Sequence, residues 1–320
     1  IDEAGNALAL RPSRGPEQAR IILLGHIDTV PGHIPVRIQD GVLHGRGSVD
    51  AKGPLAAMLL AAARAEVEEG VALEVVGAVG EETAASPGAR FLAPRRSPDA
   101  CIIGEPSGWD GVTLGYKGRL RLTAEIAGPC AHSAGAMDSA CDIAHAWWSR
   151  IRRWMDRLNH GRRGAFETIT ASIQGIHSGD DGLRQWARLH AGLRLPTWIS
   201  PDEAARTLPD LAADPVFHAE VRIEGCEVAH EVDRNDAVVR ALSSAIRAAG
   251  ATPRPKRKSG TSDMNVVAPA WNCPIAAYGP GDSSLDHTPH ERIAIDEYLR
   301  SIRILSTALG TLARELQPTP

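Results

Sequence analysis

Acidic and imidazole side chains gather in five short segments of this sequence, and their types indicate metal chemistry. Histidine and carboxylate ligands without thiolate suit zinc, with cobalt or manganese as substitutes. Their number fits two ions that share one carboxylate, about 3.5–4 Å apart, and such a pair lowers the pKa of a bound water. The segments are GHIDTV (25–30), GRGSVDAKG (45–53), VGEET (79–83), GEPSG (104–108) and DHTPHERI (286–293).

Within these segments, two pairs of residues have spacings that indicate their chemical roles. Glu81 and Glu82 are adjacent, so one can bind metal while the other, on the opposite side of the backbone, moves a proton from water to a leaving nitrogen. His26 and Asp28 are two residues apart and should point the same way, as a metal-binding imidazole and its orienting carboxylate do. Ordinary surface acids explain any single segment as well as metal ligands do. They do not explain five such segments in this order.

The apolar pattern predicts an α/β fold that brings these segments together. Buried strands are predicted at 21–24, 71–80 and 100–104, and a helix at 53–70 that Gly70 ends. This alternation implies a mostly parallel sheet flanked by helices. Ligands of such sheets gather beyond the carboxyl ends of the strands. Acids crowded there without a cation would repel one another, and their pKa values would rise.

The pattern changes near Lys117 and predicts an inserted α+β domain. The order strand–helix–strand–strand–helix–strand is typical of a ferredoxin-like unit. We therefore expect a catalytic domain over 1–117 and 233–320, interrupted by a lid domain over 118–232. The predicted elements are strands at 119–128, 167–174, 188–195, 216–224 and 274–278, and helices at 136–158, 201–208 and 237–249 and from Asp296 onward.

Composition excludes several classes of function. The net charge of −4 over 320 residues gives no reason to expect nucleic-acid binding. No apolar stretch reaches membrane-spanning length, and no signal-like segment opens the chain. The five cysteines form no CxxC pair, which argues against a disulfide framework and favours a cytoplasmic protein.

The motifs GHIDTVP, GRGSVDAKG, the paired glutamates, GEP and the late His-Thr-Pro resemble the zinc aminoacylase/carboxypeptidase superfamily. That group includes acetylornithine deacetylase, succinyl-diaminopimelate desuccinylase and glutamate carboxypeptidase. The resemblance runs along the whole chain and implies a zinc-exopeptidase-like catalytic domain with an inserted lid and dimerisation domain. Family members carry a further helix and strand ahead of the segment matching IDEAGN, so residues preceding Ile1 are expected; no metal ligand lies in that segment.

The resemblance implies two zinc ions per subunit, with cobalt as a substitute. Asp50 would bridge the ions, Glu81 would be the general acid and base, and Asp28 would orient a histidine ligand. The first ion would be held by His26, Asp50 and Glu105, and the second by Asp50, Glu82 and His287.

The resemblance also implies roles for residues of the lid. His132 in GPCAHSAG matches a histidine that reaches into the partner subunit's site and stabilises the oxyanion, which requires a homodimer; otherwise it faces solvent. Arg194 in LRLP matches an arginine that binds the substrate carboxylate through its planar fork, or else forms a surface salt bridge.

The segment RKSGTSDMN is a candidate substrate-binding loop. Its donors could bind a carboxylate or an amide, or Ser262 or Asp263 could simply cap a helix. The basic run of Arg254, Lys256, Arg257 and Lys258 is either a solvated edge or a surface that receives an acidic protein. The candidate substrate-binding residues are Lys258, Gly260, Thr261, Ser262 and Arg194.

The stretches EPSGWDGVTLGYKGRL, VPGHIPVR and RKSGTSDMN resemble the lysine-biosynthesis branch of this superfamily. Its members release lysine or ornithine from the terminal glutamyl side chain of a small acidic amino-group carrier protein. The resemblance implies a zinc-dependent amide hydrolase of this kind, related to arginine biosynthesis where ornithine is released. The alternatives are a deacetylase for acetyl-ornithine or acetyl-lysine, a succinyl-diaminopimelate desuccinylase, a dipeptide carboxypeptidase, or a metal-binding regulatory protein without activity.

Overall fold

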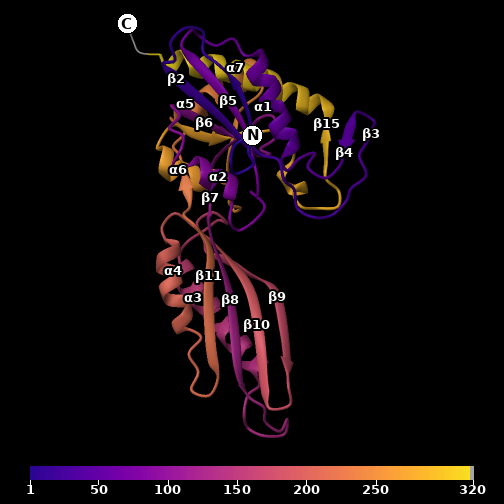
Figure 1. The fold of residues 1–320 in the computed structure, drawn as a ribbon, viewed down its shortest axis with the longest axis vertical. Coiled ribbons are helices and arrows are strands. Elements are labelled where there is room, and N and C mark those ends of the chain that lie inside the picture. Colours follow the sequence, from indigo (N-terminus) through magenta and orange to yellow (C-terminus); the bar gives the residue numbers. More distant parts are fainter. Residues whose placement is uncertain (318–320) are drawn as a thin grey trace. The chain divides into compact units, whose positions relative to one another are not determined.

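The computed structural model describes residues 1–317 and divides into two compact units (Figure 1). The sequence predicted divisions after residues 117 and 232. The structure divides the chain close to these positions, and in addition groups the short segment Ser259–Thr261 with the second unit. The first unit comprises Ile1–Gly115, Glu231–Lys258 and the chain from Ser262 onward, and the second comprises Tyr116–His230 with Ser259–Thr261.

An eight-stranded sheet forms the centre of the first unit, in the order β1-β5-β2-β6-β14-β7-β12, with β13 beside β7. Strands β5, β2, β6 and β14 run parallel, whereas β1 and β7 pair antiparallel on either side of them. The predicted α/β class is confirmed, and the sheet is mixed at its edges. The strands are β1 (Ala7–Arg11), β2 (Ala19–His26), β5 (Val71–Ala78), β6 (Ala100–Ile103), β7 (Gly111–Tyr116), β12 (His230–Glu231), β13 (Arg254–Lys258) and β14 (Ile275–Ala277).

Helices cover the central strands, which explains why the sequences of these strands are mostly apolar. All eight residues of β5 are buried. Ile21 and Leu23 of β2 belong to one core cluster with Met58, Leu242 and Leu305, which come from three helices on this face of the sheet. The helices of this unit are α1 (Lys52–Arg64), α2 (Pro87–Leu92), α5 (Ala237–Ala248), α6 (Asp263–Trp271) and α7 (Ile295–Glu315), with a 3₁₀ turn at Ser283–Leu285.

Helix α1 ends at Arg64, so its predicted extension to residue 70 was wrong. The next residue, Ala65, is extended, with φ −60° and ψ 135°. The guanidinium of Arg11 donates hydrogen bonds to the carbonyls of Ala62 and Ala65, at 2.7 and 2.6 Å. A side chain from β1 therefore satisfies carbonyls at the helix end, where intrahelical partners run out.

A small second sheet projects from the first unit, formed by segments in which the sequence predicted no strand. Its strands are β3 (Arg37–Gln39), β4 (Val42–His44) and β15 (Arg292–Ala294), in the antiparallel order β15-β4-β3. Each strand has three residues, and β15 comes from the far end of the chain, so no local periodicity reveals it. Residues 31–46 together with β15 form the flap (Figure 1).

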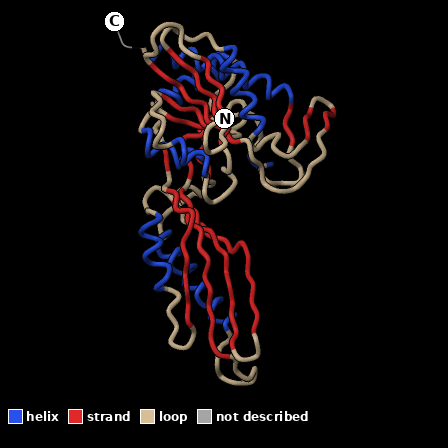
Figure 2. The backbone as a smooth tube through the Cα atoms, in the orientation of Figure 1, coloured by secondary structure: helices blue, strands red, loops and turns tan. Residues whose placement is uncertain are grey.

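The second unit is a four-stranded antiparallel sheet in the order β11-β8-β10-β9, with two helices beside it (Figure 2). Burial along β8 alternates, as expected for a sheet with one face covered. Helix α3 begins later than predicted because Ser139 and Asp142 form a capping box. The elements are β8 (Gly118–Pro129), α3 (Ala140–Asn159), β9 (Thr170–Asp180), β10 (Arg184–Leu195), α4 (Pro201–Asp210) and β11 (His218–Glu227); this is the predicted ferredoxin-like order.

Candidate metal centre

Parallel strands deliver three of the predicted segments to one edge of the main sheet. His26 is the last residue of β2 and pairs in register with Ala78, the last residue of β5. Glu81 follows the end of β5 after a glycine turn, and Glu105 follows the end of β6. Because these strands are neighbours, their carboxyl ends bring the three side chains together.

His26, Asp50 and Glu105 form one buried group of candidate metal ligands. His26 Nε2 lies 3.2 Å from Asp50 Oδ1 and 3.9 Å from Glu105 Oε1. One ligand atom from each residue lies within 4.8 Å of the others. An imidazole and two carboxylates at this spacing are donors that suit a zinc ion.

Asp50, Glu82 and His287 form a second group at the same spacing. His287 Nε2 lies 2.9 Å from Asp50 Oδ2 and 3.1 Å from Glu82 Oε1. Asp50 therefore directs one carboxylate oxygen at each histidine. This is the arrangement of a carboxylate shared between two ions, and the donor set of both groups fits divalent cations.

Asp28 joins the loops that follow β2 and β5. Its carboxylate accepts hydrogen bonds from the backbone N–H groups of Glu81 and Glu82, at 3.2 and 3.1 Å. His26 Nδ1 lies 3.1 Å from the carbonyl oxygen of Asp28 and 3.6 Å from its carboxylate. The contact on Nδ1 leaves Nε2 facing Asp50, so Asp28 orients the histidine and also holds the paired glutamates.

Glu291 positions the backbone at Asp50, and sequence reasoning missed it. Its side chain is fully buried, with 0% exposed. It accepts hydrogen bonds from the N–H groups of Val49 (2.9 Å) and Asp50 (3.0 Å) and from the Arg46 guanidinium (2.8 Å). Glu291 lies in the DHTPHERI segment that was noted for His287. The only available signal was an acid in the same short segment as a predicted ligand.

The positive charges of the chain do not balance the acids of this centre. Burial, with the nearby carboxylates of Asp263, Glu82 and Asp50, raises the pKa of Glu81 to about 8, against the effect of His26. Burial and the charges of Asp50 and Glu81 likewise raise the pKa of Glu105 well above its usual range. Carboxylates crowded in this way are stabilised when divalent cations take the place of protons.

The two histidines supply positive charge to the same acids. Hydrogen bonds to Asp50 and Glu82 raise the pKa of His287 to about 10. Burial opposes a charge on His26, but its contacts with Asp28 and Asp50 raise its pKa well above the usual value. Metal ions compete with these protons, because a ligating imidazole must be neutral.

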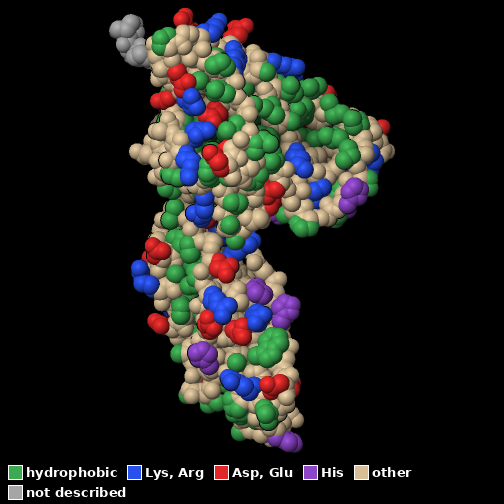
Figure 3. Space-filling view, in the orientation of Figure 1, with side chains coloured by type: hydrophobic (Ala, Val, Ile, Leu, Met, Phe, Trp, Pro, Cys, Tyr) green, Lys and Arg blue, Asp and Glu red, His purple; other side chains and the backbone are tan. Residues whose placement is uncertain are grey.

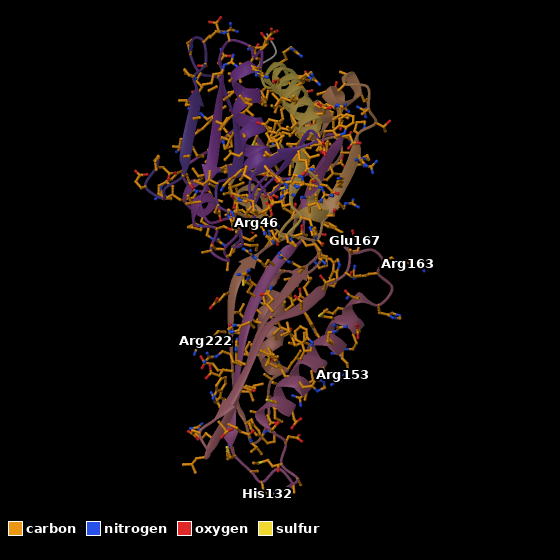
Figure 4. All side chains as sticks on the ribbon, turned by 90° about the vertical axis from the view of Figure 1, so that its right-hand side faces the viewer. Arg46, His132, Arg153, Arg163, Glu167 and Arg222 are labelled. Atoms are coloured by element: carbon orange, nitrogen blue, oxygen red, sulfur yellow. The ribbon has the colours of Figure 1, made fainter. Side chains whose placement is uncertain are left out.

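Several predicted site residues belong to the second unit. His132 is exposed in the loop between β8 and α3 (Figure 4), and its Nδ1 accepts a hydrogen bond from the N–H of Ala134 at 3.1 Å. Arg194 Nη1 donates to Thr261 Oγ1 at 2.7 Å, and that hydroxyl donates to the Lys117 carbonyl at 2.9 Å. Arg194 and Thr261 thus form one hydrogen-bonded group, with Gly260 next to Thr261 in the chain.

The remaining candidates, Ser262 and Lys258, lie in the first unit. Ser262 caps α6, with its hydroxyl 3.2 Å from the N–H of Met264, so the capping interpretation describes its contacts. Lys258 is the last residue of β13, and its charge lowers the pKa of Glu105.

The rest of the basic run is engaged within the first unit. Arg254 pairs with Asp110, Arg257 pairs with Glu231, and Lys256 donates to a backbone carbonyl. These contacts compensate much of the positive charge on which an acidic protein would depend.

Comparison with known proteins identifies the relatives of this chain. Residues 22–311 match the model of peptidase family M20/M25/M40. The chain is 45% identical over 318 residues to a LysW-lysine hydrolase of Deinococcus radiodurans, covering 98% of this chain and 86% of that protein. It is 33% identical over 300 residues to a LysW-lysine/LysW-ornithine hydrolase of Sulfurisphaera tokodaii, covering 91% and 81%.

Solved structures share the fold at lower identity. An M20 family metallo-carboxypeptidase from Sulfolobus solfataricus has a TM-score of 0.75 at 18% identity, covering 97% of this chain and 88% of that one. A tripeptidase from Staphylococcus aureus has a TM-score of 0.77 at 22% identity, covering 98% and 88%. In residues 1–317, every helix is too short or too polar to span a membrane.

Proposed function

The chain belongs to peptidase family M20/M25/M40, and from this premise we propose that it is a metal-dependent hydrolase that releases lysine or ornithine from LysW, the amino-group carrier protein. The observation that carries the chemistry is Asp50, which faces a histidine with each carboxylate oxygen while Glu81 lies beside the same cluster. The hydrolase names of two relatives support the substrate.

We assign two zinc ions to the centre, with cobalt as a substitute. His26 and Glu105 would hold one ion, Glu82 and His287 the other, and Asp50 both. Ions bound there supply a water of lowered pKa and a positive charge that polarises the amide carbonyl.

Glu81 is the group that moves the proton. Its position next to Glu82, on a segment that Asp28 holds by two hydrogen bonds, keeps its carboxylate at the cluster. It accepts a proton from the attacking water and returns it to the amide nitrogen, so that the free amino acid leaves. Its pKa of about 8 without metal falls when cations bind nearby, which leaves it ionised and ready to act as a base.

Arg194 and the segment around Thr261 are the proposed contacts to the amino acid. Arg194 can bind the α-carboxylate of lysine or ornithine through two parallel hydrogen bonds, and its bond to Thr261 supports a shared role with that residue. Gly260 and Ser262 flank Thr261, and Lys258 precedes the loop. His132 would stabilise the oxyanion in the partner subunit of a cytoplasmic homodimer.

The experiment that tests the activity uses Glu81→Gln, with carrier-bound lysine, carrier-bound ornithine and acetyl-lysine as substrates. Zinc content is measured in the same samples. We expect wild type to cleave a carrier-bound substrate and the variant to lose cleavage while retaining metal. Full activity of the variant on every amide would overturn the hydrolase assignment, and equal or greater efficiency on acetyl-lysine would overturn the carrier assignment.

A further inference from the structure

A pocket of about 360 Å³ lies in the first unit between the flap and the beginnings of α1 and α7. It is separate from the metal centre, since its described lining includes none of the centre's acids or histidines. It nevertheless adjoins the centre, because residues 46–48 and 52–53, on either side of Asp50 in the chain, form part of its wall. Its apolar lining is Val36, Leu43, Ala56, Ile293, Ile295 and Tyr298.

Large apolar side chains continue from this pocket onto the open surface of the flap. Val36 is 76% exposed and Ile38 is 67% exposed. Val36 directly precedes β3 and Ile38 lies within it, so the two exposed side chains belong to one short stretch of the flap. In Figure 3 hydrophobic side chains cover much of the flap, with basic and histidine side chains among them. Exposed apolar surface next to a pocket is typical of an interaction site.

The surroundings of the pocket are positively charged. Within residues 1–317, neither Arg37 nor Lys52 forms an ion pair or hydrogen bond through its side chain. Arg292 donates to the carbonyl of His290, and its charge also acts on the carboxylate of Asp282. Of the nearby acids, Glu291 is fully buried and bonded to Arg46, and Asp40 is exposed in the turn between β3 and β4. The flap thus differs from the basic run of β13, whose arginines are paired with acids of this chain.

We propose that the flap and its pocket are the docking surface for the carrier protein: an acidic face of the carrier lies against Arg37, Lys52 and Arg292, and one of its apolar side chains enters the pocket. This inference rests on the proposed function, because it takes the carrier as the substrate. A protein-borne amide gives the enzyme a partner with surface beyond the scissile bond, and cations beside an apolar pocket select an acidic one.

The flap is joined to the metal centre in a way that suits this role. The Arg46 guanidinium donates to the carbonyl of Thr288 at 3.2 Å and to Glu291 at 2.8 Å. Thr288 follows the ligand His287 in the chain, and Glu291 holds the backbone of Asp50. A carrier held on the flap would therefore lie beside both ligands.

The test compares a carrier-bound substrate with a small one. Arg37→Glu and Val36→Asp change exposed positions of the flap, and Arg303→Glu on α7 and Leu10→Asp on β1 are matched controls at exposed positions of the same unit. We expect each flap variant to lower kcat/KM for carrier-bound lysine about tenfold, through KM, and to leave acetyl-lysine cleavage unchanged. The controls should change neither, and calorimetric binding of the carrier to Glu81→Gln should weaken when Arg37→Glu is added.

The outcomes separate this inference from the proposed function. If wild type does not cleave carrier-bound lysine, the proposed function fails, and the docking role fails with it. If wild type cleaves it and the flap variants match wild type in kinetics and in carrier binding, the docking surface alone is overturned. Equal losses on both substrates would also overturn it, since the flap would then merely support Asp50.

Discussion

The acid within strand β5 and the acids that follow the end of this strand have opposite environments. Within the strand, the buried carboxylate of Glu74 accepts hydrogen bonds from Arg20 (2.8 Å) and Arg96 (3.1 Å). Beyond its end, Glu81 and Glu82 face His26 and further carboxylates. Where the chain supplies its own arginines, an acid stabilises the fold. Where its acids outnumber the positive charges that the chain supplies, the remaining balancing charge must come from outside the chain.

The largest effect expected from this difference follows metal removal. Treatment with a chelator should abolish amide hydrolysis, and zinc or cobalt should restore it, because only the acids beyond β5 depend on added cations. Zinc at a hundred times its dissociation constant should also raise the free energy of unfolding by about 2.7 kcal/mol. Chemical denaturation with and without zinc measures this. Mass spectrometry verifies that the metal has been removed. Activity that persists in such protein would contradict the distinction between Glu74 and the acids beyond β5.

The substitution Glu81→Gln should lower kcat by about 10²–10⁴-fold, the usual contribution of a general acid and base. Its metal content should match wild type. The same change at the other site, Glu74→Gln, should leave kcat per folded molecule unchanged, because the arginine-paired acid takes no part in the chemistry. Steady-state kinetics on both variants decides, and a comparable loss of kcat in Glu74→Gln would contradict the distinction.

The metal-free protein should lose stability as pH rises from about 4.5 to about 8. Glu81 has a folded-state pKa of about 8 and a usual value of 4.5, so the folded state binds more protons than the unfolded state across this range. Stability then falls with pH, by about 1.4 kcal/mol per pH unit for each extra proton.

The raised pKa of about 10 for His287 continues the same trend from pH 6.5 upward. Urea unfolding of metal-free protein at a series of pH values measures the slope, and Glu81→Gln should flatten it between pH 4.5 and 8. A metal-free stability that increases with pH over this interval would show that the acids beyond β5 are not crowded.

Stability should change in opposite directions when the two kinds of acid are neutralised in metal-free protein. Glu74→Gln should lower the free energy of unfolding by about 2–3 kcal/mol, below the full value for a buried ion pair because Arg20 is partly exposed. Glu105→Gln should raise it, since the pKa of Glu105 is well above its usual range and its burial costs free energy. If both substitutions lower the free energy of unfolding, the two acids do not have opposite environments.

The smallest effect concerns the acid that supports Asp50. Glu291→Gln should weaken zinc affinity about tenfold, as expected for a residue that positions a ligand, because a neutral amide holds the Val49 and Asp50 N–H groups less firmly. Competition with a chromophoric chelator measures this. The matched change of an exposed acid, Glu315→Gln, should have no effect on affinity, and unaltered affinity in Glu291→Gln would exclude the positioning role.

Local sequence was sufficient for the parts of the fold that local patterns determine. The buried strands β2, β5 and β6 are mostly apolar, and the chemistry-bearing residues lie at their ends or shortly after them, so His26, Glu82 and Glu105 could be predicted to meet. The alternation of apolar and other residues along β8 is likewise typical of a sheet with one covered face.

Other features depend on contacts between distant segments and could not be predicted. The end of α1 is determined by the Arg11 side chain from β1. The flap needs β15 to pair with β4, and the role of Glu291 exists only because its carboxylate meets the backbone of Asp50. No periodicity or spacing within a single segment carries that information.

The hydrogen bonds of Asp28 have a geometric consequence for the whole family of reactions that this scaffold could support. Adjacent strands lie about 4.8 Å apart, and one carboxylate fastens the chain after β2 to the chain after β5. The spacing of the strands thereby determines the distance between the catalytic ligands. Residues further out can be exchanged during evolution to admit new substrates, while the reactive core keeps its dimensions.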